Sequence, residues 1–234
     1  MARTLSIDIG GSKIKAMILD PKGNAVSERE RMKTPKNPTP EAVLKGMMSL
    51  AGKLGDFERV SVGFPGAVRE GVIETAPNLG TEAWHGFNLQ AELAERLGKP
   101  VRVANDATVQ GYGAITGKGV ELVLTLGTGL GTTLFVNGLA VPNLELAHHP
   151  FRRGKTYEEL LGRNALERDG VKKWNKALKQ ALDQLFRLFY FDSVAIGGGN
   201  TDLIDFKLPS NARIIPNIAG ILGGVRLWDP PLGA

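Results

Sequence analysis

The stretch that decides the fold is Leu5-Ser-Ile-Asp-Ile-Gly-Gly-Ser-Lys-Ile-Lys-Ala-Met-Ile-Leu-Asp20, near the start of a chain of 234 residues. It reads as two strands, 5–9 and 14–19, joined by a glycine-rich turn. The segment 122–137, LVLTLGTGLGTTLFVN, repeats this pattern at a constant offset of 117 residues, so that Gly10 corresponds to Gly127 and Leu19 to Val136. The repeat divides the chain into two similar halves.

Composition restricts the class of protein. A hydrophobic content of 42% is enough for a packed core, and the absence of cysteine excludes disulfides, thiolate metal sites and a thiol nucleophile. The N-terminus has no signal-peptide core and no apolar run reaches membrane-spanning length, so we expect a cytoplasmic protein that has no membrane partner. The net charge of +5 suits an anionic partner. Without a nucleic-acid-binding motif, phosphate-bearing molecules are favoured over nucleic acid.

Both halves of the repeat contain a turn of small and hydroxyl residues, at 10–13 and 128–131. Such a turn leaves backbone N–H groups free to face an anion, and a third glycine turn, 197–200, follows another predicted strand. None is a Walker P-loop, because G-x-x-x-x-G-K-[ST] is absent and the first two turns lead into strands. Two ordinary hairpins are the alternative, but their matching positions in the two halves favour phosphate binding.

A second decisive stretch is Val101-Arg-Val-Ala-Asn-Asp-Ala107, a short apolar strand that runs into an Asn-Asp pair. Open α/β sheets hold ligands at the carboxyl ends of their strands, which makes Asp106 a candidate catalytic base. The alternative is that Asn105 or Asp106 only caps the helix that follows. If Asp106 is the base of a phosphoryl transfer, Asp8 at the end of the first strand is the candidate ligand of Mg²⁺.

The second half of the sequence adds two polar features. Glu145 and His148 lie in the loop 141–150. We expect them to hydrogen-bond a ligand and not to bind a metal, because no further carboxylate or histidine stands at helical spacing from them. A set of basic residues could line a track for a polyanion or could be a solvated surface: Arg152, Arg153, Lys155, Lys172, Lys173 and Lys176. The glycine-rich helix expected near 218–227 suits close backbone packing or a ligand.

The motifs DIGGSKIKAMILD, PNLG, VANDA, LTLGTGLGTTLFVNG, ELAHH and IGGGN, in this order, resemble the ROK family of sugar kinases, and most of all its short polyphosphate glucokinase branch. The resemblance spans residues 5–228. It implies an α/β fold of two actin-like (ribonuclease H-like) lobes with duplicated βββαβαβα order and the sugar in a central cleft. We expect the lobes at 1–108 and 109–234, with a C-terminal helix (218–234) packing back on the first.

The resemblance also implies roles for individual residues. The sugar would be bound by Asn78, Asn105, Asp106, Glu145 and His148, with Asp106 as the base. Phosphates and nucleotide would be bound by Gly10, Gly11, Ser12, Lys13, Thr128, Gly129, Gly131, Gly198, Gly199 and Asn200. The zinc-binding cysteines usual in the family are missing, so no zinc is expected.

The expected activity is that of a glucokinase, which phosphorylates the 6-hydroxyl of glucose with Mg²⁺ and either inorganic polyphosphate or ATP. Alternatives are a kinase of another hexose (mannose, fructose or an N-acetyl amino sugar), a non-catalytic sugar or nucleotide sensor, and a polyphosphate hydrolase. The resemblance further implies a homodimer.

Overall fold

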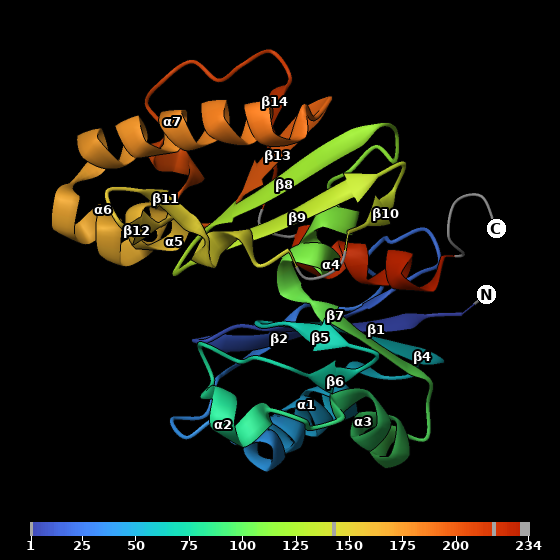
Figure 1. Cartoon of the computed structure of the whole chain (residues 1–234). Coiled ribbons are helices and arrows are strands. Elements are labelled where there is room, and N and C mark those ends of the chain that lie inside the picture. Colours follow the sequence, from blue (N-terminus) through green and yellow to red (C-terminus); the bar gives the residue numbers. More distant parts are fainter. Residues whose placement is uncertain (1, 142–143, 217–218, 230–234) are drawn as a thin grey trace. The chain divides into compact units, whose positions relative to one another are not determined.

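The structure is a computed structural model, which describes residues 2–141, 144–216 and 219–229 (Figure 1). The chain divides into two compact units, each built on a five-stranded sheet. Unit 1 extends to Gly113 and includes the segment 219–229, whereas unit 2 begins at Ala114 and contains the remaining described residues. The predicted α/β class is confirmed.

The sheet of unit 1 has the strand order β3-β2-β1-β4-β7. The first three strands are antiparallel to one another, and β4 and β7 run parallel to β1. The strands are β1 (Thr4–Ile9), β2 (Lys13–Leu19), β3 (Glu30–Lys33), β4 (Arg59–Phe64) and β7 (Val101–Asn105), and a small separate hairpin is formed by β5 (Val68–Arg69) and β6 (Val72–Ile73). The parallel arrangement places the carboxyl ends of β1, β4 and β7 at one edge of the sheet.

Helices cover both faces of this sheet (Figure 1). One face carries α1 (Pro40–Leu54) and α3 (Leu89–Leu97), which bury their apolar stripes against the strands, and the short α2 (Thr81–Trp84) adds the buried Trp84. The other carries α4 (Asp106–Tyr112), α8 (Ala219–Leu222) and the 3-10 helix η3 (Gly223–Trp228). Thr39 caps α1 and Pro40 opens it, as the Thr-Pro-Glu sequence predicts.

The C-terminal segment of unit 1 packs directly on its sheet. The hydroxyls of Ser6 and Ser61, both fully buried, donate to the carbonyls of Ile221 (2.7 Å) and Gly224 (2.6 Å). A Cβ on Gly223 would lie 1.9 Å from the Val109 carbonyl oxygen of α4. Of the two expectations for this glycine-rich segment, close backbone packing is therefore the one that the structure shows at Gly223.

The sheet of unit 2 repeats the arrangement, in the order β10-β9-β8-β13-β14. Its first three strands are antiparallel, and β13 and β14 run parallel to β8. The strands are β8 (Val120–Leu126), β9 (Leu130–Val136), β10 (Leu139–Ala140), β13 (Ser193–Gly197) and β14 (Ala212–Ile214). Corresponding strands thus occupy corresponding places in the two sheets.

The repeat offset of 117 residues holds for the first strand of each unit but not for the second. Ile9 pairs with Ile14 across a turn of four residues, whereas Leu126 pairs with Leu130 across a turn of three. Leu19 therefore corresponds to Phe135, because Thr4 pairs with Leu19 and Glu121 with Phe135. The predicted match of Leu19 with Val136 is wrong by one residue: Phe135 is fully buried like Leu19, while Val136 is 42% exposed.

The helices of unit 2 are α5 (Tyr157–Leu161), α6 (Arg163–Asp169) and α7 (Val171–Phe189), and a small hairpin precedes them, formed by β11 (Pro150–Arg152) and β12 (Lys155–Thr156). A buried stripe of α7 that includes Trp174 packs against β8 and β13. Between β13 and β14 the described chain has only the 3-10 helix η2 (Thr201–Leu203) and a loop. Asn175 of α7 anchors this connection by donating to the Leu203 carbonyl at 2.8 Å. Among the described residues, no helix is long and apolar enough to span a bilayer.

Candidate active site

The carboxyl edge of the sheet in unit 1 carries both the predicted base, Asp106, and the predicted magnesium ligand, Asp8. Asp8 of β1 is in register with Gly63 of β4, and Gly63 with Ala104 of β7. Asp8 and Ala104 are thus two strand spacings apart, about 10 Å. Asp106 follows Ala104 by two residues and opens α4. The two carboxylates therefore belong to the same edge.

Of the two residues in the Asn-Asp pair, Asn105 is the one that caps the helix. Asn105 caps α4, because its side-chain oxygen accepts from the N–H groups of Ala107 (2.9 Å) and Thr108 (3.3 Å). Its amide nitrogen donates to the Gly66 carbonyl at 3.1 Å, which fixes the side chain. Since Asn105 already satisfies the helix start, the carboxylate of Asp106 is not required as the cap. Its oxygen also accepts from Ala107 N–H at 2.7 Å.

Gly63 is a site residue that the sequence analysis did not single out. A Cβ there would lie 3.4 Å from the Asp106 Cα and 3.6 Å from the side chain of Val109. These are ordinary van der Waals distances, so β4 and the first turn of α4 pack closely at Gly63 without excluding a Cβ. The glycine in Val-Gly-Phe is the only signal in the sequence, and it is weak.

Asp8 is held by a lysine of the adjacent strand. Lys15 Nζ lies 2.7 Å from Asp8 Oδ2, and the two residues are directly opposite in the antiparallel pair of β1 and β2. Both side chains are partly buried, at 20% exposure for Asp8 and 35% for Lys15. The predicted strands, 5–9 and 14–19, leave four residues for the turn, and this register places Lys15 opposite Asp8.

The turn Gly10 to Lys13 is closed by hydrogen bonds to its carbonyl groups. Gly10 N–H donates to the Lys13 carbonyl (2.9 Å), and Thr34 donates its hydroxyl to the Gly10 carbonyl (2.6 Å) and its N–H to the Ser12 carbonyl (3.1 Å). Within the described ranges, these bonds leave the N–H groups of Gly11 and Ser12 without a partner. The turn can therefore present two N–H donors to an anion, as expected.

Asn78 lies next to this turn. A Cβ on Gly11 would be 3.4 Å from the Asn78 Cβ, so the PNLG loop and the first glycine turn are in contact. Asn78 itself is exposed, and the buried Leu79 anchors the loop beneath it. Unit 1 thus gathers Asp8, the 10–13 turn and Asn78 on one side of its sheet.

The corresponding turn in unit 2 is held by neighbours that the sequence did not suggest. Glu158 Oε2 accepts from Leu130 N–H at 3.1 Å, and a Cβ on Gly129 would lie 2.2 Å from the same oxygen. Arg163 N–H, at the start of α6, donates to the Thr128 carbonyl at 3.0 Å. A side chain at position 129 would displace this carboxylate, which is the far end of a flexible side chain, and would disturb its hydrogen bond with Leu130. Gly131 follows within β9.

The third glycine turn supports the second and borders a pocket. Asn200 is buried, and its side-chain N–H donates to the Gly127 carbonyl at 3.1 Å. Asn200 therefore stabilises the turn between β8 and β9 and does not face solvent. Gly198 has φ +98°, and a Cβ there would lie 2.2 Å from the Leu126 carbonyl oxygen. Only glycine fits this position.

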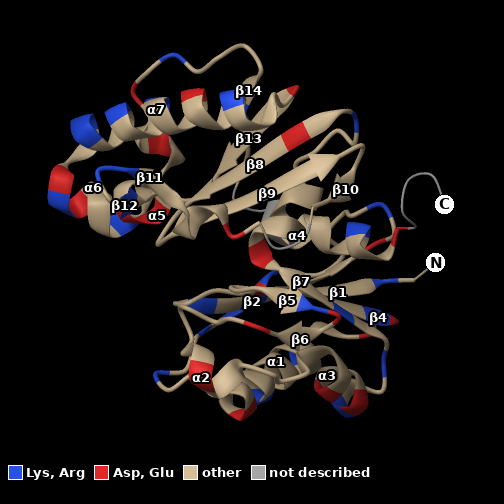
Figure 2. Ribbon diagram, viewed as in Figure 1, with Lys and Arg blue, Asp and Glu red and all other residues tan. Residues whose placement is uncertain are grey.

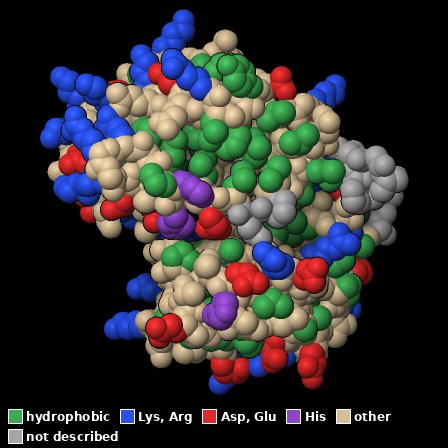
Figure 3. Space-filling model, in the orientation of Figure 1, with side chains coloured by type: hydrophobic (Ala, Val, Ile, Leu, Met, Phe, Trp, Pro, Cys, Tyr) green, Lys and Arg blue, Asp and Glu red, His purple; other side chains and the backbone are tan. Residues whose placement is uncertain are grey.

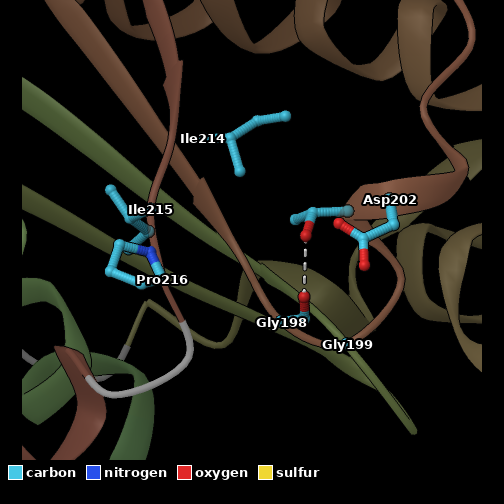
Figure 4. Close-up of a pocket in the computed structure, with 7 residues that line it drawn as sticks. Gly198, Gly199, Asp202, Ile214, Ile215 and Pro216 are labelled. Atoms are coloured by element: carbon cyan, nitrogen blue, oxygen red, sulfur yellow. Dashed lines mark hydrogen bonds between the residues drawn. The ribbon is translucent and has the colours of Figure 1, made fainter.

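Figure 4 shows the pocket beside this turn, with a volume of about 330 Å³. Gly198, Gly199 and Asp202 lie on one side of it, and Ile214, Ile215 and Pro216 lie on the other. Thr201 donates to the Gly198 carbonyl at 3.0 Å, which holds the turn closed. Of the described lining residues, only Asp202 is charged. The walls suit a flat, largely apolar ring better than a chain of anions.

Glu145 and His148 come together on the 3-10 helix η1 (Leu146–His148) of unit 2. His148 Nε2 lies 3.7 Å from Glu145 Oε2, and the side chains are 49% and 37% exposed. Glu145 has φ +44°, a backbone conformation that side chains rarely adopt. The strained residue turns its carboxylate toward the imidazole, and the pair can offer an acceptor and a ring nitrogen to a ligand.

The residues described contain no group of three or more His, Cys, Asp or Glu arranged to hold a metal ion. A magnesium ion bound through substrate phosphates needs only one or two carboxylates from the protein. Asp8, beside an N–H-rich turn at a strand end, fits that requirement. Its pairing with Lys15 means that a metal and the lysine would share the carboxylate.

The model of the ROK family matches residues 4–142, which include both glycine-rich hairpins and the Asn105-Asp106 pair. The chain belongs to the ROK family. Polyphosphate glucokinase of Mycobacterium tuberculosis is 32% identical over 93% of this ROK chain and 88% of its own length. An N-acetylmannosamine kinase of Haemophilus influenzae is 33% identical over 58% of this chain and 46% of its own length.

Solved structures agree with this assignment. The inorganic polyphosphate/ATP-glucomannokinase of Arthrobacter sp. strain KM has a TM-score of 0.87 and 33% identity, with 97% of this chain and 98% of that one covered. A ROK family glucokinase of Streptomyces griseus, in complex with glucose and AMPPNP, has a TM-score of 0.80 at 22% identity and covers 96% and 98%. The match at 22% identity shows the fold alone, and together with the glucomannokinase match it confirms the expected fold class, an α/β fold of the actin-like type.

Proposed function

We propose that this ROK-family sugar kinase transfers a phosphoryl group to the 6-hydroxyl of glucose, with inorganic polyphosphate or ATP as donor. The observation that carries the proposal is the carboxyl edge of unit 1, where Asp8, Asp106 and the 10–13 turn belong to one side of a sheet. The names of the relatives supply the substrate class, since polyphosphate glucokinases match over 93% of the chain.

In the proposed reaction Asp106 is the general base. Its carboxylate removes the proton of the 6-hydroxyl as that oxygen bonds to the terminal phosphorus of the donor, and the bond from this phosphorus to the bridging oxygen breaks. The donor leaves as a shortened polyphosphate or as ADP. The N–H groups of Gly11 and Ser12 stabilise the charge on phosphate oxygens. Because Asn105 caps α4, the helix start does not depend on the Asp106 carboxylate.

The sugar contacts are assigned to side chains of both units. In unit 1, Asn105 and Asn78 would hydrogen-bond sugar hydroxyls, and in unit 2 the Glu145 and His148 pair would do the same. In unit 2 the donor phosphates would be bound by the turn that corresponds to 10–13 and contains Thr128, Gly129 and Gly131. Lys13 itself would bind phosphate in unit 1. A homodimer, as the family resemblance implies, is part of the proposal.

Mg²⁺, when bound by Asp8 and the donor phosphates, would neutralise phosphate charge. Replacing Asp8 by Asn should raise the magnesium concentration for half-maximal activity roughly tenfold, because one anionic oxygen ligand is lost. Asp56→Asn, the same change at an exposed site, serves as the control. A magnesium titration that is identical for the Asp8 variant and wild type would contradict the assignment of Asp8.

Separate observations support ATP and polyphosphate as the phosphoryl donor. ATP is favoured by the pocket beside Gly198 and Gly199, whose apolar wall of Ile214 and Ile215 suits an adenine ring. Polyphosphate is favoured by the relatives, one of which is described as using both donors. We therefore propose that both donors share the glycine turns and that ATP alone uses the pocket.

Mannose is a second acceptor that a specific observation favours, because the Arthrobacter relative is a glucomannokinase. An acceptor panel tests the assignment: glucose, mannose, fructose and N-acetylmannosamine, each with Mg²⁺ and ATP, and 6-deoxyglucose as the control without the reacting hydroxyl. The expected kcat/KM is highest for glucose, followed by mannose. If kcat/KM is higher for N-acetylmannosamine than for glucose, glucose is not the preferred substrate. Turnover of 6-deoxyglucose would refute transfer to the 6-hydroxyl.

A further inference from the structure

The surplus positive charge of the chain is concentrated in one part of unit 2. Residues 150–187 contain ten Lys and Arg against five Asp and Glu, a surplus of +5 that equals the net charge of the whole protein. Figure 2 shows Lys and Arg positions along α6, α7 and the hairpin of β11 and β12, and Figure 3 shows basic side chains gathered over the same part of unit 2. We call six of them the basic strip: Arg152, Arg153, Lys155, Lys172, Lys173 and Lys176.

Two elements form the strip as one continuous surface. Arg152 of β11 donates to the side-chain oxygen of Gln180 on α7, so the hairpin and the helix are tied together. Lys173 and Lys176 precede Gln180 by seven and four residues and share its face of the helix. Arg152 Nε is buried and has no hydrogen-bond partner within the described residues. The hydrogen bond from Arg152 to Gln180 therefore holds the hairpin against α7, and the Arg152 Nε–H is a hydrogen-bond donor without a partner among the described residues.

Most of the strip is not neutralised by the protein. Among the residues that the structure describes, Arg153, Lys155 and the three lysines of α7 in the strip take part in no ion pair within 4.0 Å. Asp169 pairs with Arg168 at 2.6 Å, which lowers the pKa of Asp169, and the charges of Lys173 and Lys155 lower it further. Lys155 lowers the pKa of Glu159 as well, so three cations, Lys155, Arg168 and Lys173, lie near two carboxylates, Asp169 and Glu159.

Contacts within unit 2 connect the basic strip to the turn 128–131, which is proposed to bind the phosphates of the phosphoryl donor. From β12 the chain enters α5, where Glu158 accepts from Leu130 N–H, and then α6, where Arg163 N–H donates to the Thr128 carbonyl. The described lining of the pocket beside Gly198 contains no Lys or Arg, and its one charged residue is Asp202. A long anion that reaches the turn would therefore be attracted along the strip and not into the pocket.

We propose that the basic strip binds the part of a long polyphosphate chain that extends beyond the reacting phosphate. This inference rests on the proposed use of polyphosphate as donor. A single-stranded nucleic acid is less suited, because such binding uses exposed aromatic rings between the charges. Here Phe151 and Tyr157 stack on each other at 4.5 Å, and Tyr157 and Trp174 are buried.

Direct binding tests the proposal without any need for turnover. Calorimetry in low salt would compare polyphosphate of several hundred phosphates with tripolyphosphate, on wild type, on Lys173→Gln/Lys176→Gln and on Lys53→Gln/Lys207→Gln. The last variant has the same charge change at exposed positions outside the strip. We expect the strip variant to lose about tenfold in affinity for the long chain, with less than a twofold change for tripolyphosphate, and the loss to diminish as salt is added.

An equal loss in the control variant would overturn the proposal, because net charge alone would then account for binding. Unchanged affinity in the strip variant would overturn it too, and so would oligodeoxynucleotide binding as tight as that of polyphosphate at equal charge. The outcome is separable from the proposed function: a protein that makes no sugar phosphate can still show the strip-dependent binding, and an active glucokinase can lack it.

Discussion

Replacing Asp106 by Asn should lower kcat for glucose phosphorylation roughly a thousandfold or more, because the amide cannot accept the proton of the 6-hydroxyl. The fold should be little changed. Asn105 remains as the cap of α4, and its bonds to Ala107 and Thr108 do not involve Asp106. Steady-state kinetics with saturating donor and glucose would measure the loss, and thermal unfolding would check the fold.

Two comparisons sharpen that result. Asp56→Asn makes the same chemical change at an exposed position of unit 1 and should leave kcat unaltered. Asn105→Ala removes the cap and should cost about 1 kcal/mol of stability, which thermal unfolding would measure. Because Asn105 is also a proposed sugar ligand, this variant is compared for stability and not for kcat. A kcat for Asp106→Asn within tenfold of wild type would rule out Asp106 as the general base.

The largest effect on stability is expected for Gly223→Ala. The added Cβ would lie 1.9 Å from the Val109 carbonyl oxygen and 2.6 Å from Gly113 N, and both are backbone atoms that cannot rotate away. Either η3 or α4 must shift, at a cost of about 3 kcal/mol. For a chain of this length the melting temperature should fall by roughly 6–12 °C. Since α4 begins at Asp106, activity should fall as well.

Gly52→Ala is the matched control. Gly52 lies in α1, and a Cβ there would meet nothing within 4 Å. Alanine favours helix over glycine, so this variant should melt at the wild-type temperature or above it. Equal melting temperatures for the two alanine variants would show that Gly223 is not required for packing on α4.

The sequence predicted what depends on local pattern. Apolar periodicity and turn-forming residues mark three of these features: the Gly-rich hairpin near Asp8, the strand that ends at Asn105 and the repeat at 122–137. The same reasoning found that the C-terminal glycines suit close packing. These features, with the motif order, were enough for the family and the fold class.

What the sequence could not predict are contacts between distant segments. The second turn is one residue shorter than the first, and this shifted the match of Leu19 to Phe135. Thr34 closes the 10–13 turn from 24 residues away, and Glu158 reaches Leu130 across 28. No local pattern marks such residues, because their role comes from packing.

The most direct test is the formation of glucose 6-phosphate by the purified protein with glucose and Mg²⁺, with ATP and long-chain polyphosphate supplied separately at equal phosphoryl concentration. We expect glucose 6-phosphate from both donors, and none from the Asp106→Asn variant above a thousandth of the wild-type rate. If the wild-type protein binds glucose but forms no sugar phosphate with either donor, the kinase assignment is contradicted and a sensor on the same fold takes its place.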